Sequence, residues 1–311
     1  MPLGEGISLE ESAVTSTGVP FVGVELGGTK CVCTLAYGPD AILQQRVIPT
    51  TLPETTLAAI VATLFEWDAA YGFAAIGIAS FGPICLDPAD ARYGSILATN
   101  KSGWRDCDIV SAIAGPFERP FAFDTDVNGA ALAEMHWGCA QGLQDFAYVT
   151  VGTGIGVGLI VHGLPTRGIG HSEIGHIRVP RTPGDTVASS CRYHDDCVEG
   201  LASGSALVAR LAGRDVDALT PDDPIWKPMI SALAAMAHTL VATTGPFRIA
   251  IGGGVVTRQP HLLAQIETEM EISLAGYMAL PPTRPIIVAP ALGELAGPLG
   301  SIALAMAASA R

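Results

Sequence analysis

Two stretches of this sequence share one pattern, in which two apolar runs flank a glycine turn. The first unit spans residues 21–36 around the turn 26–30, and the second spans 146–161 around the turn 152–156. Both units read as strand, turn and returning strand, and they lie about 125 residues apart, which indicates a duplicated domain. A chain with two such units is expected to form two similar sheets, each containing one antiparallel hairpin.

The remaining segments predict strands that alternate with helices. Residues 55–71 have helical apolar spacing, whereas residues 75–79 and 121–123 read as short buried strands. A helix is expected to follow the second of these strands and to run through Gly138. A third glycine turn, 252–254, follows another expected strand and opens a helix. This alternation predicts a layered α/β architecture.

Length and composition limit the class of protein. The 311 residues suffice for two domains, and residues 1–19, which lack periodicity, are expected to form a mobile tail. Hydrophobic residues make up 49% of the chain, but the charge-free run 228–247 is alanine-rich and reads as a buried helix rather than a membrane span. We therefore expect a soluble protein without a membrane partner.

The net charge of the chain limits which molecules it can bind. The formal net charge of −13, with only three lysines, argues against binding to nucleic acid. It leaves room for an anionic nucleotide, because backbone amides and a metal ion can supply positive charge locally.

Four residues of metal-ligand type lie close together in the sequence. His176, Cys191, His194 and Cys197 are separated by fourteen, two and two residues. Two thiolates and two imidazoles are the set that a closed, tetrahedral zinc site requires. The alternative is that the thiols are ordinary and the histidines lie on the surface, but four such residues at compact spacing favour zinc.

A disulfide between Cys191 and Cys197 is the weaker alternative. The chain has seven cysteines, an odd number, and no stretch resembling a signal peptide precedes them. We expect a reducing, cytoplasmic location.

The glycine turns are candidates for phosphate binding. Glycine lets backbone N–H groups approach a phosphate chain, although it marks ordinary hairpins equally well. Three such turns, two of them with Thr29 or Thr153 alongside, favour phosphate. The Walker pattern and a strand–GxGxxG–helix unit are both absent from the sequence, which argues against P-loop and Rossmann sites.

Seven motifs follow one another along the chain: Gly27-Gly28-Thr29-Lys30, Asp124-Thr125-Asp126-Val127-Asn128, Gly152-Thr153-Gly154-Ile155-Gly156, His171-Ser172-Glu173-Ile174-Gly175-His176, the cysteine cluster, Glu199-Gly200-Leu201-Ala202-Ser203-Gly204 and Gly252-Gly253-Gly254-Val255. Together they resemble the ROK family of sugar kinases and repressors, in order, from about residue 20 to the C-terminus. Within the family they are most similar to the bacterial zinc-containing fructokinases.

The resemblance implies an actin-like (ribonuclease H-like) ATPase fold, in which two α/β domains surround a cleft. The smaller domain would comprise residues 20–130, with a C-terminal helix at about 296–311 packing back on it, and the larger domain, 131–295, would carry the zinc site. The ATP phosphates would lie on Gly27, Gly28, Thr29, Lys30, Gly152, Thr153, Gly154, Gly253 and Gly254.

The same resemblance implies roles for acidic residues. Asp126 matches the catalytic base, which would accept the proton of the sugar hydroxyl as it attacks the γ-phosphorus. The alternative for an Asp before a helix is an N-cap, and Asp124 is the better structural candidate. Glu173, His176 and Glu199 match positions that hold sugar hydroxyls. Asn128 is a further candidate, although it reads equally well as a helix cap.

Magnesium is expected with ATP, and Glu25 and Asp126 are candidates to hold its hydration shell. Many relatives carry Asp at the position of Glu25, so the part of Glu25 in metal binding stays open. Thr125 stands where glucokinase-like relatives have Asn, which weakens a glucokinase reading. The remaining histidines, without partner spacing, read as structural or surface residues: His136, His162, His238 and His261.

The favoured hypothesis is an ATP-dependent kinase that converts D-fructose to fructose 6-phosphate. The alternatives are a kinase for mannose, glucose or an N-acetylhexosamine, and a non-catalytic sugar sensor. A repressor would need a DNA-binding module ahead of Gly23, and a zinc hydrolase would need an open coordination position, which four ligands do not leave. A homodimer is expected from the family and is compatible with the apolar composition.

Overall fold

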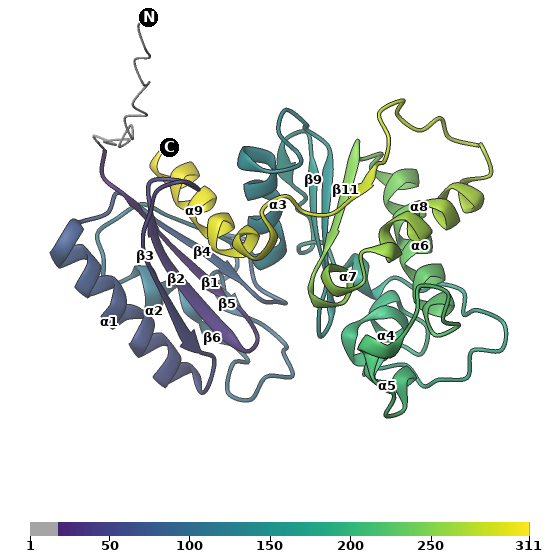
Figure 1. The fold of residues 1–311 in the computed structure, drawn as a ribbon. Helices are drawn as coiled ribbons and strands as arrows, with labels where there is room; N and C mark the ends of the chain where they lie inside the picture. Colours follow the sequence, from purple (N-terminus) through teal and green to yellow (C-terminus); the bar gives the residue numbers. More distant parts are fainter. Residues whose placement is uncertain (1–17, 311) are drawn as a thin grey trace, which may run out of the picture.

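The structure is a computed structural model, which describes residues 18–310. The chain forms two lobes side by side, each built on a five-stranded sheet (Figure 1). The tail expected over residues 1–19 lies outside the described residues except for Gly18 and Val19, which belong to no helix or strand.

The first sheet has the strand order β3-β2-β1-β4-β7. β1 pairs antiparallel with β2 and parallel with β4, and β4 pairs parallel with β7. The glycine turn 27–29 closes the β1–β2 hairpin, as the sequence predicts. The strands are β1 (Phe21–Leu26), β2 (Lys30–Ala36), β3 (Ile42–Pro49), β4 (Ile76–Ser80) and β7 (Phe121–Thr125).

The second sheet repeats this topology with the order β10-β9-β8-β11-β12. β8 pairs antiparallel with β9 and parallel with β11, and β11 pairs parallel with β12. The strands are β8 (Phe146–Val151), β9 (Ile155–Val161), β10 (Leu164–Pro165), β11 (Arg248–Gly252) and β12 (Ile287–Val288), and a separate small ladder joins β5 (Ser95–Ile96) to β6 (Cys107–Asp108). The repeat that the two strand–turn–strand units predict is present.

Sequence patterning did not reveal the edge strand β3. Ile48 is its one buried residue, and Val47 is exposed. With one buried residue in eight, the strand lacks the alternation of apolar and polar residues that would mark it in the sequence.

The helices form layers around the two sheets. α1 and α2 cover one face of the first sheet, α9 covers the other, and α3 lies between the sheets, whereas α6 and α8 pack beyond the second sheet (Figure 1). The helices are α1 (Pro53–Tyr71), α2 (Ile109–Ala114), α3 (Asp126–Trp137), α4 (Val198–Ala202), α5 (Gly204–Leu211), α6 (Trp226–Thr243), α7 (Gly254–Arg258), α8 (His261–Leu274) and α9 (Ala296–Ser309), with 3₁₀ turns η1 (Ile174–His176), η2 (Val216–Ala218) and η3 (Gly293–Leu295).

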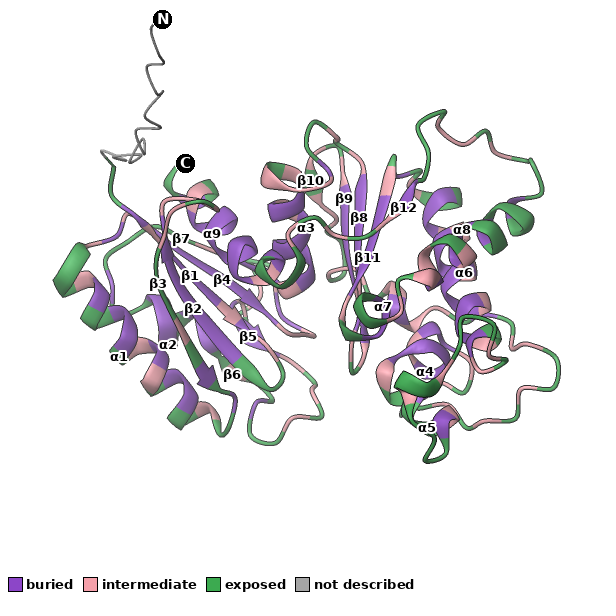
Figure 2. Ribbon diagram, viewed as in Figure 1, coloured by how far each residue is buried: buried purple, intermediate pink, exposed green. Residues whose placement is uncertain are grey.

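Burial follows these layers (Figure 2). Each sheet has its own large apolar core, and α6, expected as a buried helix, contributes ten buried residues to the second core. Across residues 18–310, no helix combines the length and apolar character needed to span a bilayer.

The helices α3 and α9 cross at two glycines. A Cβ on Gly300 would overlap the backbone of Gly129. Because α3 also packs on β8 and β9, and α9 packs on β1 and β4, this crossing joins the two lobes.

Replacing Gly300 tests this contact. Inside a helix Gly→Ala alone stabilises by about 1 kcal/mol. At this crossing we expect Gly300→Ala to lower the free energy of unfolding by about 1–3 kcal/mol, because the methyl group must displace the backbone of α3. Urea unfolding measures the change. Gly38→Ala, at a turn where a Cβ has no neighbour within 4 Å, is the control and should change stability by less than about 0.5 kcal/mol.

Candidate active site

Two adjacent cavities lie where the lobes meet. The first, of about 830 Å³, is lined by Gly28 and Thr29 of one lobe and by residues 152–157 of the other. The second, of about 620 Å³, is lined by Glu25, Tyr148 and the third glycine turn. Asp126, Val127 and Thr150 line both cavities, so the carboxylate of Asp126 lies on their common wall.

The local sequence places Asp126 at this wall. β7 ends at Thr125, whose hydroxyl caps α3 by accepting from the Asn128 N–H at 3.1 Å. Asp126 is thus the first residue of the helix and is not its cap, and its carboxylate accepts from the Val127 N–H at 2.9 Å.

The electrostatic surroundings of Asp126 favour its protonated form. Burial, and then the charges of Glu25 and Glu173, raise the pKa of Asp126 to about 7, although hydrogen bonds from backbone N–H groups oppose the shift. Burial likewise raises the pKa of Glu25 to about 6, with Lys30 opposing it. A carboxylate whose pKa lies near neutrality is suited to exchange a proton with a substrate.

Asp124, two residues earlier, has a different environment. Its side chain is 3% exposed and accepts from the Thr125 N–H at 2.7 Å, from Asn128 Nδ2 at 2.8 Å and from Arg167 of the other lobe. Asn128 therefore turns toward Asp124 and lines neither cavity, and its buried Oδ1 has no hydrogen-bond partner among the described residues.

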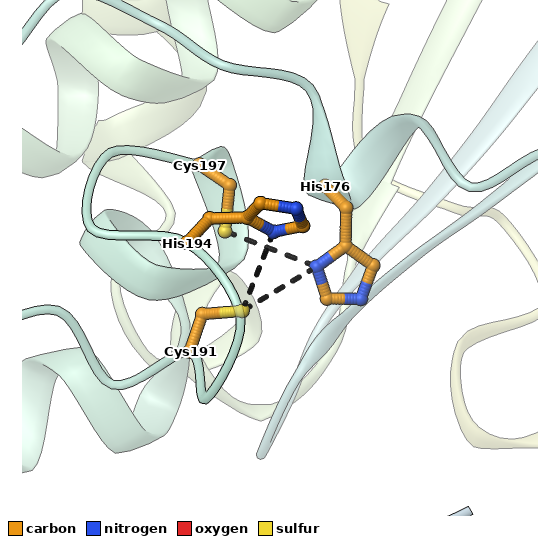
Figure 3. A group of neighbouring side chains, drawn as sticks. All are labelled: His176, Cys191, His194 and Cys197. Carbon is orange, nitrogen blue, oxygen red and sulfur yellow. Dashed lines mark hydrogen bonds between the residues drawn. The ribbon is translucent and has the colours of Figure 1, made fainter. Parts of the chain in front are cut away.

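The predicted metal ligands converge (Figure 3). One ligand atom from each of His176, Cys191, His194 and Cys197 lies within 4.8 Å of the others. Cys191 Sγ lies 3.7 Å from both His176 Nδ1 and His194 Nδ1, and Cys197 Sγ lies 3.8 Å from His176 Nδ1. Tetrahedral zinc bonds of about 2.3 Å to sulfur and 2.0 Å to nitrogen give S···N edges of roughly 3.5 Å, so this donor set fits zinc.

The other predicted sugar-site residues surround the first cavity. Glu173, His176 and Glu199 all line it. Glu199 Oε2 accepts from the Ile155 N–H at 3.0 Å, and Glu199 Oε1 lies 3.8 Å from His176 Nε2. The cysteine cluster, the second glycine turn and the cavity wall are thereby connected.

The structure separates the predicted phosphate-binding residues. Gly28, Thr29, Gly152, Thr153 and Gly154 line the first cavity, whereas Gly253 and Gly254 line the second. Gly253 has φ 86°, and a Cβ there would lie 2.6 Å from backbone atoms of Val151, so the close approach requires glycine. Gly27 and Lys30 line neither cavity.

Sequence reasoning missed several residues of this site. Lys101 Nζ donates to the Gly28 carbonyl at 2.5 Å, and His171 and Tyr193 line the first cavity. Lys101 is one of only three lysines, and His171 lies two residues before Glu173. The scarcity of lysine and the closeness of His171 to Glu173 are the sequence features that could have pointed to these two residues.

Comparison with known proteins follows this geometry. The model of the ROK family matches residues 21–308. The chain belongs to the ROK family. A fructokinase of Pediococcus pentosaceus is 38% identical over 92% of this chain and 97% of its own length, and a fructokinase of Zymomonas mobilis is 40% identical over 92% and 96%.

Solved structures of ROK proteins share the fold. The ROK hexokinase of Thermus thermophilus has a TM-score of 0.74 at 28% identity, covering 93% of this chain and 98% of its own. A ROK glucokinase of Streptomyces griseus, in complex with glucose and AMPPNP, has a TM-score of 0.71 at 25% identity over 93% and 99%. The predicted actin-like fold, with two α/β lobes, is confirmed.

Removing the charge of Asp126 should stabilise the protein at high pH. The pKa of Asp126 in the folded state is about 7, above the 3.8 of an unperturbed Asp. Between about pH 4 and 7 the folded protein therefore keeps a proton on Asp126 that the unfolded chain has lost. Stability falls as the pH rises through that window. Part of the side chain faces the cavities, so we expect Asp126→Asn to gain about 1–2 kcal/mol at pH 8, less than the roughly 4 that three pKa units imply.

Urea unfolding at pH 4.5 and pH 8 measures this gain. Asp40→Asn, at an exposed turn, is the control and should show no pH-dependent difference. An equal effect of Asp126→Asn at both pH values would contradict the raised pKa.

The pair of Arg167 and Asp124 gives a second prediction. Arg167→Met leaves a buried carboxylate without its cation, which should cost about 1–3 kcal/mol of stability. Arg119→Met is the matched control, because Arg119 and Arg167 are both 43% exposed, but Asp68, the partner of Arg119, is 29% exposed. We expect the control to cost less than about 1 kcal/mol. Thermal and urea unfolding measure both variants. Equal losses of stability in Arg167→Met and Arg119→Met would contradict a buried charge pair.

Proposed function

We propose that this chain is an ATP-dependent sugar kinase that phosphorylates the 6-hydroxyl of D-fructose to give fructose 6-phosphate. One observation carries the proposal, namely that Asp126 lies on the wall common to the two cavities. Sugar in the first cavity and nucleotide in the second would bring the attacking hydroxyl and the γ-phosphate to one carboxylate. The fructokinases among the relatives support fructose as the substrate.

In this mechanism Asp126 orients the 6-hydroxyl and accepts its proton. The bond between that oxygen and the γ-phosphorus forms as the bond to the ADP oxygen breaks, and the proton goes to the Asp126 carboxylate. Because phosphoryl transfer depends mainly on positioning and charge stabilisation, orientation contributes at least as much as proton transfer. Glu173, His176 and Glu199 would hold the sugar hydroxyls.

The glycine turns would hold the triphosphate through backbone N–H groups. Gly28 and Thr29 of one lobe and residues 152–154 of the other would do so where the phosphates reach from the second cavity into the first, and residues 253–254 would do so within the second cavity. Gly27 and Lys30, which line neither cavity, would shape the first turn. Glu25 and Asp126, which share the second cavity, would hold the water shell of Mg²⁺, which neutralises phosphate charge when bound.

The two lobes would close on their substrates as separate domains. The proposed division assigns residues 20–130 and the C-terminal helix to one domain and residues 131–295 to the other. Separate apolar cores support this division. Closure would exclude water and so limit ATP hydrolysis.

We further propose that the enzyme is a cytoplasmic homodimer with a structural zinc ion. None of the seven cysteines, all of which lie in the described part of the chain, forms a disulfide, which is consistent with a reducing compartment. The zinc would fix His176 and the loop 191–197, so that Glu199 and the free nitrogen of His176 stand at the sugar cavity. Light scattering on purified protein would test the dimer.

A sugar panel tests the activity. We expect ATP-dependent phosphorylation of D-fructose in preference to mannose, glucose and N-acetylhexosamines, measured by coupled ADP release. Asp126→Asn should lower kcat at least about a hundredfold. Preference for another hexose would reassign the substrate, and no turnover of any hexose by folded protein would contradict the kinase.

Removal of one cysteine ligand tests the metal. Cys191→Ser should lose about one zinc ion per chain and lower the unfolding temperature by roughly 5 °C or more, because the metal joins two segments. Metal analysis and calorimetry on the same samples measure both effects. Cys107→Ser, outside the cluster, is the control and should keep its zinc. Unchanged metal content in Cys191→Ser would refute the site.

A further inference from the structure

The segment 166–173, here called the strap, follows β10 in the second lobe and reaches the first lobe at two points. Arg167 contacts Asp124 at the end of β7, and His171 contacts Ile84 in the loop after β4. The strap ends at Glu173, which lines the first cavity. It therefore lies between a proposed sugar ligand and the opposite lobe.

The contact with Ile84 fixes the protonation of His171. The Ile84 N–H donates to His171 Nε2 at 3.1 Å, and a backbone N–H can only donate, so Nε2 carries no proton. The side chain of His171 is 7% exposed, and a Cβ on Gly82 would lie 3.1 Å from the ring. The ring is thus neutral, with its proton on Nδ1, and packed against the Gly82–Ile84 loop.

The protonated nitrogen hydrogen-bonds the Ser172 carbonyl oxygen and lies beside Glu173. His171 Nδ1 lies 3.5 Å from Glu173 Oε1 and 3.3 Å from the Ser172 carbonyl oxygen. Glu173 is 52% exposed, so without such a partner its carboxylate could adopt several rotamers. Both ring nitrogens of His171 are occupied, which leaves none to bond a sugar.

We propose that His171 is a positioning residue, which orients the sugar-binding carboxylate of Glu173 only while the Gly82–Ile84 loop of the opposite lobe is docked. This inference rests on the proposed function, in which Glu173 holds sugar hydroxyls. Docking of the lobes fixes the tautomer, and the tautomer places the proton on Nδ1, which lies 3.5 Å from Glu173 Oε1. Attraction between that N–H and the carboxylate then holds Glu173 in position for the sugar. We call this connection, from the Gly82–Ile84 loop through His171 to Glu173, the relay. The apparent affinity for sugar depends on the relay, whereas the transfer step at Asp126 does not.

Two variants of His171 separate the halves of the relay. Glutamine places an amide near the position of Nε2 and can accept from Ile84, whereas asparagine places one near Nδ1 and can donate to Glu173. We expect both His171→Gln and His171→Asn to raise the KM for fructose roughly tenfold, with kcat and the KM for ATP within about twofold of wild type. His162→Asn, at an exposed histidine outside both cavities, is the control and should match wild type.

A double-mutant cycle tests whether His171 acts through Glu173. The double variant of His171→Gln and Glu173→Gln should have a fructose KM within about twofold of Glu173→Gln alone. A fructose KM near wild type in His171→Gln would overturn the proposal, since the histidine would then only tie the lobes together. Additive effects of the two substitutions on the fructose KM would also overturn it. So would a fall in kcat, or a rise in the KM for ATP, as large as the rise in the KM for fructose.

Nitrogen-15 NMR of the histidine-labelled, unliganded protein gives a readout that needs no substrate. We expect His171 to be neutral, with the proton on Nδ1. A proton on Nε2 would overturn the relay whatever the activity. If the protein phosphorylated no hexose but His171 showed the expected tautomer, the proposed function would fail and the lobe contact would stand.

Discussion

The crossing of α3 and α9 at Gly129 and Gly300 is the contact on which the site depends. α9 lies on the first sheet, α3 reaches the second, and the absence of side chains at the crossing lets their backbones touch. Because α3 begins at Asp126, the same contact determines where that carboxylate stands between the lobes. A shift of the two helices would move Asp126 away from the wall common to the two cavities.

Two neighbouring aspartates show how the structure assigns different roles to one residue type. Asp124 is paired with Arg167 and Asn128, whereas Asp126 faces the cavities near Glu25 and Glu173 and has no ion-pair partner among residues 18–310. The pairing stabilises the buried charge of Asp124, whereas burial and the charges of Glu25 and Glu173 raise the pKa of Asp126 to about 7. A site rich in carboxylates needs positive charge to bind a triphosphate, and backbone N–H groups and a divalent cation can supply it. The glycine turns and Glu25 would meet part of that need.

Much of this arrangement could be predicted from local sequence. The spacing of His176, Cys191, His194 and Cys197 predicted a cluster that the structure brings together, and the strand–turn–strand units predicted both hairpins. The sequence did not predict three other features, namely that Asn128 turns toward Asp124, that His171 contacts Ile84 and that β3 forms the edge of the first sheet. Those features depend on contacts between segments far apart in the sequence or on exposed positions without a hydrophobic pattern, for which no local signal exists.

A crystal structure with D-fructose and AMPPNP would show whether sugar and nucleotide meet at Asp126. We expect fructose in the first cavity, with its 6-hydroxyl within about 3 Å of an Asp126 carboxylate oxygen and the nucleotide reaching from the third glycine turn to that hydroxyl. A sugar bound with its reacting hydroxyl away from Asp126, or a nucleotide whose phosphates avoid the wall common to the two cavities, would contradict this expectation.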